Sequence, residues 1–227
     1  MNSARLETRI NGSSLGLYRA SLLEYSIGAV EYSGGYIMPA AKALPVKLTP
    51  KIGLREIVLT LDFEGDNPRE ISKAISELTA DLITSADIEL PDGFHYWCVF
   101  DSASSQKHAA PWIDQVTFNL HGLRHEEMKT SRFTHSGKMI VEGNRSTPAI
   151  VKLTPVSGAS SMSFNGITIN TSTVVTIDGV NTTVLDGNGN NVFGNTDMTE
   201  WPKLDPGDNT ITLSGCSAEI SYYPIFV

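Results

Sequence analysis

The chain has 227 residues, 41% of them hydrophobic and 19% charged, which is enough for one large domain or two modest ones. The net charge of −8, with lysine and arginine scattered among acidic residues, argues against a nucleic-acid-binding protein, because phosphate contacts need a basic face. No apolar run approaches the ~18 residues that cross a bilayer, so we expect no insertion into a membrane.

The N-terminal residues and the cysteines bear on the compartment in which the chain folds. Arg5, Glu7 and Arg9 stand where a secretion signal would carry apolar residues, so we expect no export signal. Cys98 and Cys216 either form a disulfide between two domains or remain as two small buried thiols. A reducing cytoplasm favours the thiols.

One helix is predicted in the first part of the chain, beginning after residue 67. Asn67 can cap this helix, Pro68 suits its first position, and Glu70 completes a start that resembles a capping box. Apolar residues then recur at steps of three and four, which places them on one face. They are Ile71, Ala74, Ile75, Leu78, Leu82 and Ile83.

Strands are predicted on both sides of this helix. A hairpin at Asn11-Gly12 ties down the N-terminal segment, and residues 57–63 and 116–120 alternate apolar and polar side chains as half-buried strands do. The almost continuous apolar run over residues 94–100 predicts a strand buried on both faces. One helix on a mostly antiparallel sheet indicates an α+β domain, which we place at residues 1–142.

After Gly143 the helical pattern disappears and short strands follow closely. They are expected at residues 149–153, 162–164, 167–170, 173–177, 182–185, 209–213 and 219–223. Dipeptides that favour tight turns stand between them, namely Asn165-Gly166, Asp178-Gly179, Asp186-Gly187 and Pro206-Gly207. This density of strands indicates an all-β sandwich or jelly roll, which we place at residues 143–227.

Residues that favour tight turns are concentrated in residues 201–211. Pro206 presets its φ angle, and Gly207 can take the positive φ that a type II turn needs at its third position. The whole string resembles the C-terminal signature of the distal tail protein family of siphophages. The residues that carry this motif, in a structural role, are Trp201, Pro202, Leu204, Pro206, Gly207 and Asn209.

The resemblance extends along the rest of the chain. Residues 146–148, the hairpin at 164–166, residues 175–178 and the turn at 185–187 are similar to that family, and so is the order of elements before Gly143. The resemblance implies an α+β ring-forming (belt) domain followed by an all-β galectin-like sandwich.

For function, the resemblance implies a structural virion protein and not an enzyme. Its homohexameric ring, built from the N-terminal domains, would connect the tail tube protein to a tail-tip, tail-associated or receptor-binding protein. The subunit would be assembled in the host cytoplasm and reside at the tip or baseplate of the virion tail. Weak glycan binding would be compatible with this role. Two alternatives stay open: a carbohydrate-binding module with an attached α+β domain, and a wall-degrading tail hydrolase.

Histidines gather in one region of the sequence without forming a known metal motif. His121 and His125 have the one-turn spacing of a helical metal site, but Gly122 interrupts any helix there. The other histidines of this region are His108 and His135. We therefore expect no metal-binding residue among them.

Two further patterns imitate functional motifs. Asp186-x-Asn188-x-Asn190 matches the first three ligands of an EF-hand loop, whereas the sixth position is not Gly and the twelfth is not Glu. The sequence also lacks the Gly-x-Ser-x-Gly motif of serine hydrolases. We expect no catalytic residue and no cofactor.

Trp201 admits two roles. An exposed indole could stack on a sugar ring, whereas a buried one would close the sandwich beneath the Pro206-Gly207 turn. A tryptophan buries a large area and Pro202 fixes the chain beside it, which favours the role in the core.

Overall fold

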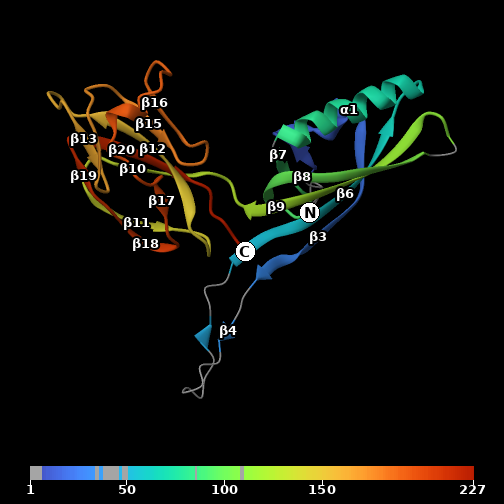
Figure 1. Ribbon diagram of the computed structural model, residues 1–227. Coiled ribbons are helices and arrows are strands. Elements are labelled where there is room, and N and C mark those ends of the chain that lie inside the picture. Colours follow the sequence, from blue (N-terminus) through green and yellow to red (C-terminus); the bar gives the residue numbers. More distant parts are fainter. Residues whose placement is uncertain (1–6, 34–35, 38–45, 48–50, 85, 108–109) are drawn as a thin grey trace, which may run out of the picture. The chain divides into compact units, whose positions relative to one another are not determined.

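The computed structural model describes residues 7–33, 36–37, 46–47, 51–84, 86–107 and 110–227. Contacts divide the chain into two compact units, one of residues 1–124 with Val227 and one of residues 125–226 (Figure 1). Each unit has its own hydrophobic core. The described strand pairs are antiparallel, and α1 (Pro68–Thr84) is the one α-helix among the described residues.

The first unit is built on a seven-stranded sheet. In order across the sheet its strands are β2 (Ser13–Ser14), β1 (Arg9–Ile10), β7 (Ala86–Glu89), β8 (His95–Lys107), β9 (Ile113–His125), β6 (Lys51–Glu64) and β3 (Ala20–Ser33). A short 3-10 turn, η1 (Leu15–Tyr18), precedes β3, and β4 (Tyr36–Ile37) pairs with β5 (Val46–Lys47).

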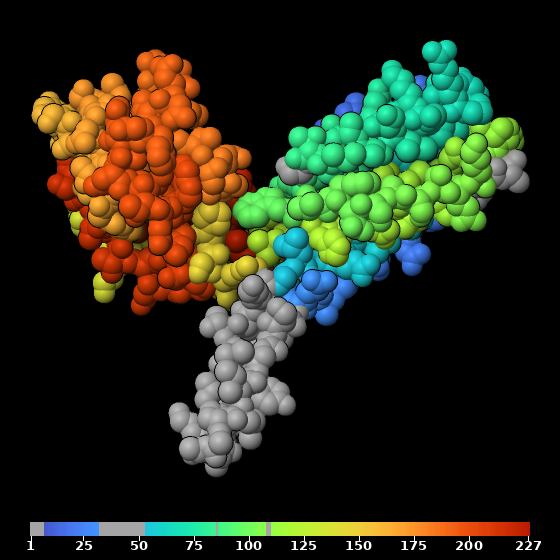
Figure 2. All heavy atoms as spheres, in the orientation of Figure 1, coloured from blue at the N-terminus to red at the C-terminus, as the bar shows by residue number. Residues whose placement is uncertain are grey.

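The predicted start of the helix is confirmed. The Asn67 side-chain oxygen accepts hydrogen bonds from the backbone N–H groups of Arg69 and Glu70, both at 3.1 Å, while its amide donates to the Glu70 carboxylate. Ile71, Ala74, Leu78 and Leu82 are buried against the sheet. Ile83 was expected on this face but is 62% exposed, because one residue beyond Leu82 the helix has turned by about 100°. Figure 2 shows α1 as a teal ridge along the surface of this unit.

The two strands predicted from alternation are confirmed. Ile57, Leu59, Leu61 and Phe63 of β6 are fully buried, and β9 pairs with β6 so that Val116, Phe118 and Leu120 enter the same core. These buried side chains share one face of the sheet and form the centre of the first unit.

The prediction for residues 94–100 was wrong in one respect. Residues 95–100 form part of β8, but only one face of that strand is buried: Tyr96 and Cys98 point into the core, whereas Val99 is 60% exposed. Period-two geometry turns successive side chains to opposite faces, and only one face of β8 lies against the core. The hairpin at Asn11-Gly12 is confirmed, with φ angles of 51° and 77° and with Arg9 opposite Ser14.

The second unit contains only strands and one 3-10 turn among its regular elements. Its largest sheet has the order β10 (Lys129–Phe133), β20 (Cys216–Tyr222), β12 (Thr147–Pro155), β15 (Val175–Asp178) and β16 (Thr183–Asp186), with β17 (Lys203–Leu204) also paired to β12. The remaining strands are β11 (Gly137–Val141) with β18 (Gly207–Ile211), and β14 (Ile167–Ile169), β13 (Met162–Phe164) and β19 (Leu213–Ser214). The 3-10 turn is η2 (Phe193–Asn195). Each of the seven strands predicted here overlaps an observed one.

The second unit begins before the predicted boundary at Gly143. The contacts divide the chain between Arg124 and His125. The reason lies in two strands that precede Gly143, because β10 pairs with β20 and β11 pairs with β18, near the end of the chain. Met139 and Val141 of β11 belong to the core of the second unit.

The hairpin turn of the second unit and the two cysteines also agree with the sequence predictions. Asn165 and Gly166 have φ angles of 47° and 88° and join β13 to β14 as predicted. Cys98 and Cys216 are both buried thiols, one in each unit, as the reducing-compartment argument favoured. No helix in the described ranges is long and apolar enough to cross a membrane.

Candidate functional site

Gly207, the first residue of β18, has the positive φ angle that was predicted for it. Gly207 has a φ angle of 89°, as the third position of a type II turn requires. The Asn209 side chain closes the turn, because its amide donates to the carbonyls of Asp205 (2.6 Å) and Gly207 (3.0 Å) and its oxygen accepts from the Asp205 N–H (3.2 Å). The positive φ of Gly207 and the hydrogen bonds of the Asn209 side chain therefore fix the backbone between β17 and β18.

The segment before this turn is held against the large sheet at one point of close approach. The Pro202 carbonyl accepts a hydrogen bond from the Ala149 N–H, and the Ala149 carbonyl accepts one from the Gly179 N–H, both at 2.9 Å. A Cβ atom on Gly179 would lie 2.8 Å from the Ala149 oxygen and 2.9 Å from the Pro202 oxygen. Gly179 is therefore needed for close packing and not for a positive φ. Leu204, two residues after Pro202, is buried in the core.

Trp201 lies at the edge of the second core. Its side chain is half-buried and packs against the core, and its ring centroid is 5.9 Å from that of Phe193. The other side of Trp201 lines an open hollow of about 400 Å³, together with the Asn165-Gly166 turn and residues 197–203. The side chain of Trp201 is therefore in contact with the core and also accessible from the hollow.

The histidines predicted to be unsuitable for a helical metal site lie on a strand. His121 and His125 are four residues apart on β9, which separates them by about 13 Å in an extended chain. His125 is buried, its Nδ1 atom lies 2.9 Å from the Glu126 carbonyl oxygen, and its ring meets that of Tyr223 edge-on. His108 lies outside the described residues, and His135 is exposed with its Nδ1 atom beside the Thr134 hydroxyl.

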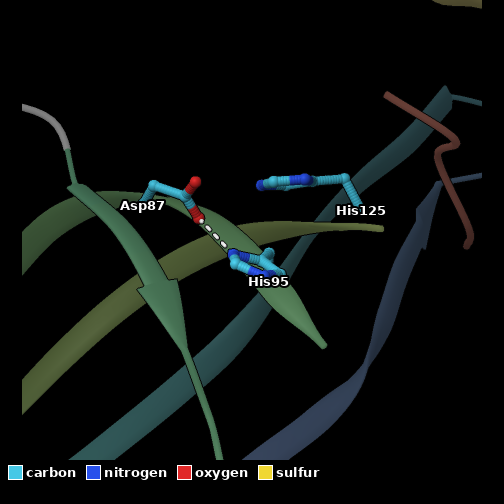
Figure 3. A group of neighbouring side chains, drawn as sticks. All are labelled: Asp87, His95 and His125. Atoms are coloured by element: carbon cyan, nitrogen blue, oxygen red, sulfur yellow. Dashed lines mark ion pairs between the residues drawn. The ribbon is translucent and has the colours of Figure 1, made fainter. Parts of the chain in front are cut away.

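Asp87, His95 and His125 form the one group of three metal-ligating side chains found among the described residues (Figure 3). Their ligand atoms lie within 4.8 Å of one another, and the Asp87 carboxylate is 3.4 Å from Nδ1 of His95 on the neighbouring strand. His125 is the last residue of β9 and the first of the second unit. We assign no metal here, because the two ligands within one unit are fewer than the three or four of protein zinc sites.

The EF-hand-like string has a structural role within its own loop. One carboxylate oxygen of Asp186 accepts hydrogen bonds from the backbone N–H groups of Asn188 (2.8 Å) and Asn190 (2.9 Å). The Asn190 side-chain amide also donates to this carboxylate, and these bonds lower the pKa of Asp186. The carboxylate therefore closes the loop after β16.

Exposed apolar side chains gather around the start of β3 in the first unit. Leu17 and Leu23 are 70% and 57% exposed, and Trp112 is 58% exposed. An open hollow of about 700 Å³ lies beside Trp112 and Arg19, and another of about 560 Å³ lies beside Leu23 and Leu15; Ala20 and Ser21 line both. Arg19 forms an ion pair with Glu70 at the start of α1. The sequence pattern did not single out these residues, although Trp112 follows a proline between two predicted strands. We call Leu17, Leu23 and Trp112 the exposed apolar surface.

The fold is similar to that of phage tail proteins. The Dit protein of phage SPP1, described as a paradigm of the hub adsorption apparatus in phages that infect Gram-positive hosts, aligns with a TM-score of 0.70 and 16% identity. The alignment covers 98% of this chain and 99% of that one. Two chains from the phage P2 baseplate in its activated conformation, with calcium and with strontium, each align with a TM-score of 0.58. They are 11% and 12% identical to this chain, and the alignments cover 93% and 92% of it and 92% of each of those chains.

The sequence itself is far from these proteins. No protein-family model matches this chain, and no curated protein shows significant sequence similarity to it. The likeness therefore concerns the fold, which is that of the SPP1 Dit protein over both units.

Proposed function

We propose that this chain is a distal tail protein of a siphophage or prophage, a structural subunit of the hub at the end of the tail. One observation carries the proposal: the fold follows that of the SPP1 Dit protein over nearly the whole length of both chains. Fold alone does not imply function, but a match that includes two different domains in the same order is more restrictive than a match of one β-domain.

The whole-chain match also bears on the alternative functions. A carbohydrate-binding module with an unrelated α+β attachment would match other modules through its second unit only. The match of the first unit, with its single helix on a seven-stranded sheet, instead favours the hub. The role proposed is therefore structural, and the protein works through its surfaces and not through catalysis.

The proposed assembly is a closed ring of six copies. Residues 1–124 would form the belt, with the sheet that contains β6 and β9 toward the opening, and the second unit, a galectin-like sandwich, would project outward. A ring of this kind needs two different complementary faces on each subunit. The exposed apolar surface supports this, because large exposed apolar side chains are typical of contact sites.

The proposed partners are the tail tube protein on one side of the ring and a tail-tip, tail-associated or receptor-binding protein on the other. This places the protein in the virion tail after assembly in the host cytoplasm. Neither nucleic-acid binding nor membrane insertion is part of the proposal.

Light scattering across a range of concentrations, followed by particle imaging, tests the ring. We expect six-membered rings with a central opening, either for the protein alone or after its tail-tube and tip proteins are added. Replacing both Leu17 and Trp112 with serine should reduce ring formation, whereas Val156→Ser, at an exposed valine of the second unit, is the matched control. A protein that stays monomeric even with both partners present would contradict the proposal.

A further inference from the structure

The hollow beside Trp201 has the features of a small-ligand site in the second unit. We propose that it binds a neutral saccharide, with the indole of Trp201 as the platform for a pyranose ring. The site stands apart from the hub function, because all of its residues belong to the second unit and none to the exposed apolar surface.

The platform is held in place before any ligand arrives. Trp201 packs on the core with part of its surface exposed, its ring contacts that of Phe193, and the buried Pro202 fixes the backbone beside it. A tryptophan fixed in this way offers a flat apolar area to the C–H groups of a sugar at little further cost in conformational entropy.

Two polar side chains at the hollow are oriented by bonds to the protein. The Asn165 oxygen accepts from the Thr212 N–H (2.8 Å) and from the Thr212 hydroxyl (3.2 Å), which identifies the oxygen end of the amide and leaves its NH₂ group as a donor. One Asp197 carboxylate oxygen accepts from the Thr168 N–H at 2.6 Å, so the second oxygen remains an acceptor. A fixed donor and a fixed acceptor beside an aromatic face suit a ring that carries hydroxyl groups.

The charges at the hollow determine the class of saccharide. Asp197 and Glu200 contribute two negative charges, and Lys203, whose Nζ lies 3.6 Å from Glu200, contributes one positive charge. The local excess of negative charge disfavours phosphate and uronic acid groups, while the polar rim disfavours a purely apolar ligand. A neutral, polyhydroxylated ring fits both conditions.

Saturation-transfer NMR on the full chain tests this proposal with defined probes: neutral tetrasaccharides of glucose, galactose and N-acetylglucosamine, and a tetramer of galacturonic acid. We expect transfer from aromatic protons to at least one neutral probe and none to the acidic one. Trp201→Phe keeps an aromatic ring in the core but reduces the platform, and should weaken binding about fivefold. Asn165→Asp keeps the acceptor and tolerates the positive φ but removes the donor, and should weaken binding about twofold to tenfold.

Ile140→Ala is the matched control, because it removes exposed apolar area from the second unit outside the hollow and should leave saccharide binding unchanged. Thermal melting of each variant shows whether it remains folded. The proposal is overturned if no neutral probe receives saturation, if the acidic probe binds as well as the neutral ones, or if folded Trp201→Phe and Asn165→Asp proteins bind like wild type. Ring formation measured on the same samples is a separate result, so failure of this site would leave the hub function standing.

Discussion

Gly179→Ala should destabilise the second unit strongly although it adds a single methyl group. The added Cβ would lie 2.8 Å and 2.9 Å from the carbonyl oxygens of Ala149 and Pro202, against at least 3.4 Å for an ordinary contact. Both oxygens belong to the backbone and accept hydrogen bonds, so neither can move aside as the end of a flexible side chain would.

The expected magnitude follows from three opposing contributions. Overpacking costs about 1–3 kcal/mol. Weakening the two hydrogen bonds that involve these carbonyls costs about 1 kcal/mol each. Replacing glycine with alanine restricts the unfolded chain and stabilises the folded state by about 0.4–1 kcal/mol. The unfavourable contributions dominate, and we expect a net loss of about 2–4.5 kcal/mol.

Urea unfolding of the full chain, followed by circular dichroism, provides the measurement. Because the two units have separate cores, the transition that includes the second unit should shift, and native-state hydrogen exchange can locate the effect there. Gly194→Ala is the control, since its Cβ would have no atom within 4 Å and its φ is not positive. Equal unfolding midpoints for the two variants would refute the close-approach argument.

Three further predictions concern the helix cap, a buried thiol and the boundary between the units. Asn67→Ala should lower the free energy of unfolding by about 1 kcal/mol because it removes the acceptor of two backbone N–H groups, whereas Asn67→Ser, which keeps an N-cap acceptor without adding a charge beside Glu70, should melt near wild type. Burial raises the pKa of Cys98 from 9.0 to about 12, so the stability that its neutral form contributes is present below pH 9 and is lost as the pH rises toward 12. Accordingly, iodoacetamide at pH 8 should alkylate Cys98 slowly in the folded protein and rapidly in urea; equal rates would contradict its burial. A fragment of residues 125–227 should melt cooperatively with a strand signal by circular dichroism, whereas a fragment of residues 143–227 lacks β10 and β11 and should be markedly less stable; equal melting of the two would contradict this boundary.

Local patterns predicted the elements whose partners or caps are close in the sequence. The Asn67 cap, the Asn11-Gly12 and Asn165-Gly166 hairpins and the Pro206-Gly207 turn are all specified within a few residues. The type of residue is decisive there, because each conformation is available to few amino acids.

The boundary between the units could not be predicted in the same way. Residues 129–133 form β10 because they pair with β20, which lies near the end of the chain. The side chains of β10 are half-buried or exposed and show no apolar alternation. A strand whose pairing is supplied from so far away carries little signal of its own. Composition changes near Gly143, but the pairing of β10 and β11 places the start of the second unit at His125.

The residues of the candidate functional surfaces could not be predicted from the sequence for a related reason. Hydrophobic periodicity identifies side chains that point inward, and it treats an outward Leu23 or Trp112 as an exception to the pattern. The role of Trp201 is also difficult to predict from the sequence, because its side chain packs on the core and also lines the hollow. For the proposed role in the tail hub, the informative residues are those whose apolar side chains remain exposed, and only the structure distinguishes them from the core residues.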